Sequence, residues 1–194
     1  NARHILVASG DTHSRILYLV RVKGEFGGLI GDGASAFVLQ SAGPDGSDTP
    51  YRLDEFLFGC AGTYASALRI GLSAEQGIAL TFEGETLARA AVEQMGRVLE
   101  DLELRTGRKR SEASAFALHQ PNPRLVQLLA RQAGLPLNKI PQVAVNCGNL
   151  GSSTCGVALS MALKENPLQV GSQRGPIFVA AVGPGLLWGG TVLY

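Results

Sequence analysis

Residues 113–124 read ASAFALHQPNPR, a short apolar run that ends in a histidine and is followed by two closely spaced prolines. The apolar run is typical of a buried strand, and it places His119 where the strand ends and a turn begins. Pro121 and Pro123 each fix the backbone angle φ, so the turn after His119 should be stiff. Ligands of α/β proteins usually bind beyond strand ends. His119 is therefore a candidate functional residue, and a hydrogen-bonded structural histidine is the alternative.

The rest of the chain predicts a sheet with helices on both faces. Pro123 suits the first turn of a helix and Gly134 suits a C-cap, and apolar residues recur every three or four positions over 85–104. A basic surface loop is expected at 106–112. Apolar strands mixed with amphipathic helices predict an α/β fold. The expected strands are 4–9, 35–40, 52–60, 113–119, 142–146, 176–183 and 189–194, and the expected helices are 85–104, 123–134 and 152–163.

Composition excludes several classes of protein. The chain has 194 residues, of which 45% are hydrophobic and 17% charged, and its formal net charge is +1. This balance is typical of a globular domain and gives no field that attracts nucleic acid or an anionic membrane. Three widely spaced cysteines favour a reducing compartment and predict no metal site. With no long apolar run and no signal peptide, we expect a cytoplasmic protein. Residues 1–2 are expected to be a tag remnant.

Two further turns carry residues suited to binding. Residues 146–154, NCGNLGSST, lie between an expected strand and an expected helix, so the Asn149 amide could face a ligand beside the helix N-terminus. The alternative is that Asn149 only shapes the turn. Residues 182–190, VGPGLLWGG, join the last two strands, and their glycines would let the backbone approach a ligand closely.

Four segments in this order resemble one family. They are GDGASAFVL (31–39), HQPNPR (119–124), GNLGSST (148–154) and VGPGLLWGG (182–190). The family typically writes them as GDGAGAVVL, HQANxR, GNTSAAS and FGxGxTWG. The chain thus resembles the C-terminal half of a β-ketoacyl-acyl-carrier-protein synthase III, a condensing enzyme of the thiolase superfamily. The resemblance implies half of a layered α/β/α/β/α fold with a mixed sheet. It divides the chain into 3–30, the last strand of the N-terminal half with a linker, and 31–194, the C-terminal thiolase-like domain.

The resemblance also implies a reaction. Such acyltransferases condense an acyl-CoA with a malonyl carrier-protein thioester, with loss of carbon dioxide, in fatty acid or polyketide-type biosynthesis. They use a cysteine, a histidine and an asparagine and no additional cofactor. His119 and Asn149 match the last two, and would donate hydrogen bonds to the thioester oxygen as it becomes an enolate. The family's cysteine lies upstream of the matching segments, so we expect this chain alone to be inactive.

The resemblance assigns roles to two more groups of residues. Gly183, Pro184 and Gly185 match the turn that supplies an oxyanion-hole N–H, but Pro184 has no N–H to give. Asn122 and Arg124 match residues near the pantetheine passage and the carrier-protein contact, and an ordinary exposed arginine is the alternative for Arg124. The implied partners are an acyl carrier protein, a coenzyme A thioester and, in the intact protein, a second copy in a homodimer. Neither nucleic acid nor a membrane is expected as a partner.

Two other functions remain open. The chain could be a non-catalytic partner or carrier-protein-binding subunit of a condensing enzyme, which Pro184 would allow. It could instead be a self-contained hydrolase or acyltransferase that uses Cys60 and His119. Cys60 follows the first motif, where the family has a variable strand and loop, so we expect a small buried residue there. Cys147 and Cys155 are also expected to serve packing.

Overall fold

The structure is a computed structural model that describes residues 3–15, 28–41, 51–73, 77–165 and 175–194. The expected tag remnant at 1–2 and residues 16–27 of the expected linker lie outside the described residues. The elements that position the site are β1 His4–Asp11, β2 Gly33–Gln40, β3 Leu53–Cys60, β4 Leu68–Ser73, β5 Gly77–Phe82, α3 Gly84–Thr106, β6 Ala115–Leu118, α4 Pro123–Ala133, α5 Val143–Cys147, α6 Thr154–Glu165, β7 Ile177–Gly183 and β8 Leu187–Leu193.

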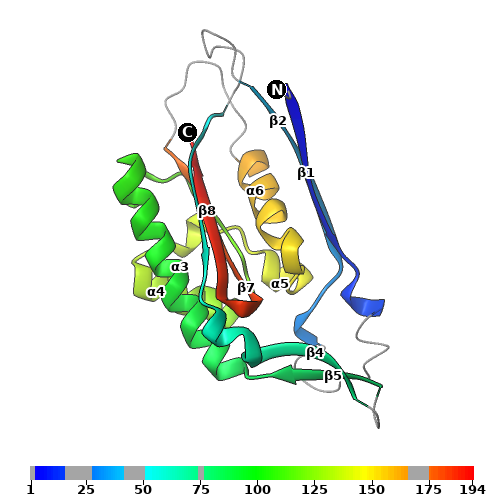
Figure 1. Cartoon of the computed structure of the whole chain (residues 1–194). Coiled ribbons are helices and arrows are strands. Elements are labelled where there is room, and N and C mark those ends of the chain that lie inside the picture. Colours follow the sequence, from blue (N-terminus) through cyan, green and yellow to red (C-terminus); the bar gives the residue numbers. More distant parts are fainter. Residues whose placement is uncertain (1–2, 16–27, 42–50, 74–76, 166–174) are drawn as a thin grey trace.

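A mixed four-stranded sheet with the order β3-β8-β7-β6 forms the centre of the molecule (Figure 1). β6 and β7 are parallel, and Ala115 pairs with Ile177. β7 and β8 form an antiparallel hairpin, and β3 pairs antiparallel with β8 at the edge. The parallel pair needs a long crossover, and α4, α5 and α6 lie in this crossover. The turn after β6 and the turn after β7 therefore lie at the same end of the sheet.

Alternate side chains of the sheet enter two separate cores. In β6, Phe116 and Leu118 belong to the core shared with α3 and α4, whereas Ala115 and Ala117 belong to the core shared with α6. Phe116 stacks on Phe178 of β7 with 5.7 Å between ring centroids. Since strand side chains alternate between faces, this division covers both faces of the sheet. The predicted α/β class, a mixed sheet covered by helices, is confirmed.

Helix α3 packs closely on β8 because β8 carries glycine at the crossing point. Of the predicted stripe, Met95, Val98 and Leu102 are buried. A Cβ built on Gly190 would lie 2.7 Å from Val98 and 3.0 Å from Leu102, so no larger residue fits without displacement. The helix ends at Gly107 in the left-handed conformation, with φ of 68°, as is common for glycine after a helix.

A second sheet layer covers the other side of α6. β1 and β2 pair antiparallel and lie beyond α6, which is thereby placed between two sheets (Figure 1). Gly156 of α6 makes the approach possible, because a Cβ there would lie 2.6 Å from the Ser35 Cβ and 3.2 Å from the Phe37 ring. The strands expected at 4–9 and 35–40 are both present in this layer.

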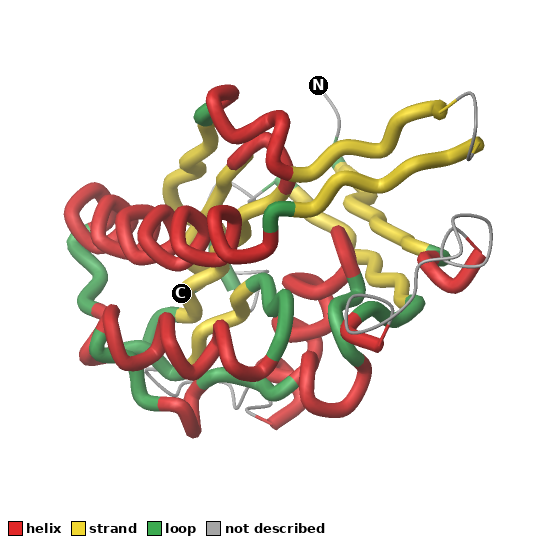
Figure 2. Tube along the Cα trace, turned by 90° about the horizontal axis from the view of Figure 1, so that it is seen from below, coloured by secondary structure: helices red, strands yellow, loops and turns green. Residues whose placement is uncertain are grey.

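One prediction of local structure was wrong, and one pair of strands was not predicted. Residues 142–146 were expected to form a strand, but Val143–Cys147 is the short helix α5. Buried Gln120 explains this helix, since its Oε1 accepts from Ala144 N (3.0 Å) and its Nε2 donates to Pro141 O (2.5 Å). The antiparallel pair of β4 and β5 was not expected, and it extends away from the central sheet (Figure 2). No helix in the described part of the chain is both long and apolar enough to span a membrane.

Candidate active site

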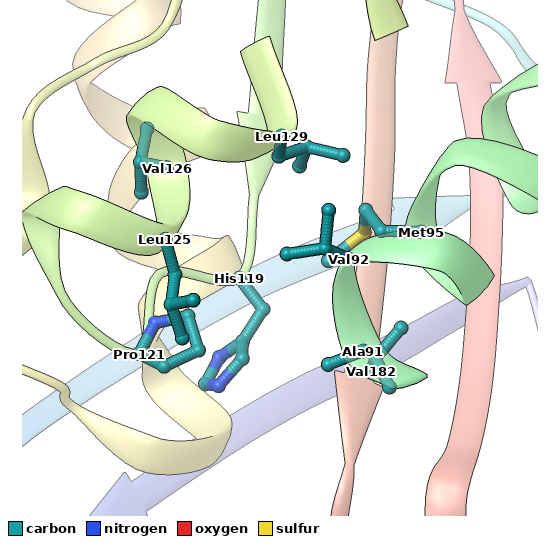
Figure 3. Close-up of a pocket in the computed structure, with 9 residues that line it drawn as sticks. All are labelled: Ala91, Val92, Met95, His119, Pro121, Leu125, Val126, Leu129 and Val182. Atoms are coloured by element: carbon teal, nitrogen blue, oxygen red, sulfur yellow. The ribbon is translucent and has the colours of Figure 1, made fainter. Parts of the chain in front are cut away.

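His119 continues the line of β6 by one residue. Its backbone N–H donates to Ala180 O of β7 at 2.9 Å, and this bond fixes where the side chain leaves the sheet. The ring lies beside Pro121 and Leu125, with side chains of α3 and Val182 of β7 on the other side of the cavity (Figure 3). This cavity has a volume of about 20 Å³, enough for one water molecule. His119 is therefore held in a tight, largely apolar setting, as the stiff turn predicted.

Burial determines the charge of this histidine. It lowers the pKa of His119 to about 4, and a hydrogen bond with the backbone of Gly151 acts in the opposite direction. At neutral pH the imidazole is therefore uncharged, with one ring nitrogen as a donor and the other as an acceptor. A neutral imidazole can donate a hydrogen bond to an oxygen that gains negative charge.

Asn149 lies between α5 and α6, and not directly after a strand as expected. Its backbone is clamped by the segment that precedes β2, since its N–H donates to Leu29 O (2.7 Å) and its carbonyl accepts from Gly31 N (2.9 Å). Gly148, with φ of 74°, brings the chain into this position. The side-chain Oδ1 accepts from Gly151 N at 2.9 Å. Within the described residues, the Nδ2 group of Asn149 has no acceptor, so its donors remain available.

The two candidate residues meet at the backbone of Gly151. Gly151 donates its N–H to the Asn149 side chain, and its carbonyl accepts a hydrogen bond from the His119 ring. Its carbonyl additionally accepts from the Thr154 hydroxyl at 3.0 Å. Gly151 has φ of 59°, a conformation that glycine adopts without strain. One short loop thus brings together an imidazole and a carboxamide that lie 30 positions apart in the sequence.

Leu150, which replaces a small residue of the family motif, points into the core. It is 3% exposed and packs against the glycines of the first motif. A Cβ built on Gly33 would lie 2.9 Å from Leu150, and one built on Gly31 would lie 3.1 Å from it. The glycines of GDG therefore make room for Leu150, which their sequence pattern alone did not indicate.

The turn at Gly183–Gly185 begins directly after β7. Pro184–Leu186 form a single 3₁₀ turn in which Gly185 has φ of 73° and buried Leu186 has φ of 47°. A non-glycine residue in this region is strained, and packing together with a hydrogen bond from Ala61 N to Leu186 O (3.1 Å) holds it there. Pro184 supplies no N–H, so a donor at this turn would have to come from a neighbouring residue.

Asn122 and Arg124 occupy the first turn of α4. The Asn122 side chain accepts from Leu125 N at 2.9 Å and caps the helix, a role that stabilises α4 by about 1 kcal/mol. Arg124 is exposed. The contacts of Asn122 and Arg124 with pantetheine and a carrier protein stay predictions.

The cysteines fall into two groups. Cys155 is largely buried, and its thiol donates a hydrogen bond to Ala180 O with 3.3 Å between Sγ and the oxygen. Burial raises the pKa of this thiol to about 12. Both observations fit a packing role. Cys60 and Cys147 are exposed, so the expectation of a buried Cys60 was wrong, and exposure does not fit the packing role expected for Cys147. Cys60 lies with Gly183 and Trp188 in an open groove of about 510 Å³, whereas His119 lines a different cavity. This arrangement does not favour a Cys60–His119 pair.

Two contributors to the site were missed by sequence reasoning. Gln120 is fully buried and fixes the start of α5. Asp11, at the end of β1, accepts hydrogen bonds from Ser152 in the loop after Asn149. A polar residue directly after His119 was the only available signal for Gln120, and no local signal links residues 11 and 152. The described residues contain no cluster of His, Cys, Asp or Glu side chains suited to a metal ion.

The sequence and the fold are similar to those of known proteins. Residues 104–194 match the family described as 3-oxoacyl-[acyl-carrier-protein (ACP)] synthase III C terminal. The chain is 28% identical to the β-ketoacyl-[acyl-carrier-protein] synthase III of Ruegeria sp. (strain TM1040), over 99% of this chain and 58% of that protein. It is 33% identical to the same enzyme of Thermosynechococcus vestitus, over 84% of this chain and 51% of that protein.

Solved structures extend the similarity to three dimensions. The 3-oxoacyl-(acyl carrier protein) synthase III of Pseudomonas aeruginosa PAO1 superimposes with a TM-score of 0.79 and 26% identity, over 98% of this chain and 57% of that one. The priming β-ketosynthase from the R1128 polyketide biosynthetic pathway gives a TM-score of 0.80 and 27% identity, over 99% of this chain and 57% of that one. The chain thus spans between half and three fifths of the length of these relatives.

Proposed function

We propose a function on the premise that this chain has the sequence and the thiolase-like fold of the C-terminal half of a β-ketoacyl-[acyl-carrier-protein] synthase III. The chain supplies the His/Asn half of the active site of a condensing acyltransferase. A cysteine outside this chain accepts the acyl group from a coenzyme A thioester. The site formed with His119 and Asn149 then acts on the malonyl thioester.

The observation that carries this proposal is the meeting of His119 and Asn149 at Gly151. When the malonyl group loses carbon dioxide, the electron pair of the broken C–C bond moves into the thioester and its oxygen becomes an enolate. The single imidazole N–H of His119, which exchanges the Gly151 carbonyl for the substrate oxygen, and a carboxamide N–H of Asn149 stabilise that oxygen. The resulting carbanion attacks the acyl cysteine, and the cysteine thiolate leaves. Each preorganised donor is worth roughly 3–4 kcal/mol of transition-state stabilisation.

The proposal includes substrates and partners. Acyl-CoA and a malonyl carrier protein are the substrates, no additional cofactor takes part, and the intact protein acts as a cytoplasmic homodimer. Arg124 is exposed on the first turn of α4, which starts four residues after His119. A cation there is suited to the acidic surface of a carrier protein whose pantetheine arm enters beside His119. The pathway is fatty acid or polyketide-type biosynthesis.

Kinetic separation of the two half-reactions tests the role of His119. In a protein that joins this chain to a cysteine-bearing half, His119→Ala should lower decarboxylation of malonyl carrier protein by about 10²–10³-fold. Acyl loading from acyl-CoA, followed by mass spectrometry, should change only a few-fold. Arg131→Ala, an exposed change on the same helix as Arg124, is the control. Equal losses in both half-reactions would contradict the role of His119.

Pro184 favours a second candidate function. Without an N–H in the middle of the turn, the chain would serve as a non-catalytic, carrier-binding subunit of a condensing enzyme. Measuring carrier-protein affinity and turnover on the same joined protein separates the two functions, because the subunit would bind without turnover. The 194-residue chain alone should not condense acyl-CoA with malonyl carrier protein. Turnover by this chain alone would instead favour the self-contained enzyme that uses Cys60.

A further inference from the structure

The end of β1 is tied to the loop that follows Asn149. The Asp11 carboxylate accepts two hydrogen bonds from Ser152 through the same oxygen, Oδ2: one from the backbone N–H at 2.8 Å and one from the hydroxyl at 2.5 Å. Hydrogen bonds to a carboxylate are about twice as strong as those between neutral groups. The tether joins residues that lie 141 positions apart in the chain.

The same end of β1 packs directly on Gly151. A Cβ built on Gly151 would lie 2.6 Å from the Cε1 atom of His13 and 2.9 Å from Asp11 Oδ2. The His13 Nδ1 atom also lies 3.0 Å from Gly31 O, and Gly31 N donates to the Asn149 carbonyl. The end of β1 and His13 just beyond it therefore contact the loop after Asn149, and His13 also contacts Gly31, which is hydrogen-bonded to the Asn149 backbone. The His13 Nε2 atom lies 4.0 Å from Asp11 Oδ1, and among the described residues it is the basic side-chain atom recorded beside this carboxylate.

We propose that Asp11 is a positioning residue of the condensing site: by holding Ser152, it fixes the Gly151 backbone to which both His119 and Asn149 are hydrogen-bonded. The catalytic role of this positioning rests on the proposed function, but the experiment that tests the positioning does not require that function. Asp11 touches neither of the two candidate residues. It acts through Ser152, the residue directly after Gly151. When the tether is cut, residues 149–153 can relax and water can reach the His119 ring.

The titration of His119 in the 194-residue chain, followed by NMR of the ring nitrogens, measures this positioning directly. In the unmodified chain, burial keeps the pKa of His119 at about 4. Asp11→Ala should move it toward the ordinary value of 6.5 by about one unit, because the larger effect, burial, is relieved when the ring is hydrated, and this outweighs the weaker hydrogen bond with Gly151, whose loss alone would lower the pKa. Asp11→Asn, which keeps the shape and an acceptor oxygen, should give a smaller shift in the same direction.

The chain offers a matched control at the same end of β1. Asp32 accepts from the backbone N–H and the hydroxyl of Ser14, in the same pattern as the bonds between Asp11 and Ser152. Ser14→Ala removes that hydroxyl bond without touching the loop after Asn149. It should leave the pKa of His119 unchanged. A shift in Ser14→Ala equal to that in Asp11→Ala would show a general loosening of β1 and overturn the proposal.

The remaining outcomes are equally decisive. A folded Asp11→Ala chain in which His119 titrates as in the unmodified chain would refute the positioning role. If Asp11→Ala does not fold, Asp11→Asn and Ser152→Ala each weaken the tether without removing it. An upward shift in both supports the proposal, and no shift in either overturns it. Because this readout needs no turnover, a failure of the condensing function would appear separately, in the half-reaction kinetics.

Discussion

His119 illustrates how a single residue couples site chemistry to stability. Its pKa of about 4 in the folded chain lies below the ordinary value of about 6.5 expected in the unfolded chain. Between these two pH values the unfolded chain binds a proton that the folded chain does not. Burial of the neutral ring therefore destabilises the fold progressively as the pH falls through this window.

We predict that the free energy of unfolding falls by up to about 3 kcal/mol through His119 alone when the pH is lowered from 7 to 4. Urea denaturation at several pH values measures this quantity. Carboxylates also titrate in this range, so the comparison is with His119→Gln, whose stability should depend less steeply on pH. Parallel curves for the two proteins would show that the His119 ring is not buried in its neutral form.

For single residues, the sequence predicted where His119 and Asn149 lie along the chain's strands and turns better than it predicted which residues they contact. The apolar run before His119 and the two prolines after it were enough to predict a histidine at a strand end in a stiff turn. The turn conformation of Asn149 was also within reach, because asparagine between glycines favours such turns. The contact of both His119 and Asn149 with Gly151 could not be predicted from the sequence, because it depends on how α6 lies against β6. The roles of His119 and Asn149 in catalysis stay predictions.

Helix α6 depends on a glycine where it crosses β2. A methyl group on Gly156 would enter the space of the Ser35 side chain, with the Phe37 ring 3.2 Å away. Forcing extra atoms into a packed contact lowers the free energy of unfolding by roughly 1–3 kcal/mol. Because α6 begins directly after the loop that carries Gly151, a displaced helix would also disturb the site.

We therefore predict that Gly156→Ala lowers the free energy of unfolding by about 1–3 kcal/mol, as measured by urea denaturation at neutral pH. Gly96→Ala on α3 is the matched control, since a Cβ there meets nothing within 4 Å. A glycine-to-alanine change in an open helical position should raise stability by roughly 0.5–1 kcal/mol. If both variants were equally stabilised, the close contact between α6 and β2 would be wrong.

The elements that the sequence predicted correctly are those with a sustained pattern. Helix α3 has four-residue and three-residue apolar spacings over many turns, and α4 has both proline and glycine at its ends. The short run at 142–146 fits a strand and a helix equally well by pattern, and the buried side chain of Gln120 selects the helix. The short strands β4 and β5 are stabilised by each other, so neither had a clear signal of its own.

At the scale of the whole molecule, the layers bring the site together. α6 lies between the central sheet and the β1–β2 sheet (Figure 1), so its N-terminal loop faces the ends of both sheets. His119 lies at the end of β6 on one side of this loop, and Asp11 lies at the end of β1 on the other side. The family motifs predicted this layered fold by resemblance. The contact between residues 11 and 152 depends on three-dimensional packing, and no local sequence pattern predicts it.

The most direct test of the central claim is a double-mutant cycle of His119→Ala and Asn149→Ala. It is measured as the rate of malonyl-thioester decarboxylation in a protein that joins this chain to a cysteine-bearing half. If both side chains donate to one thioester oxygen as a unit, the double variant should be little slower than the slower single variant. Losses that multiply independently, or an Asn149→Ala rate equal to that of the unmodified protein, would contradict a shared site.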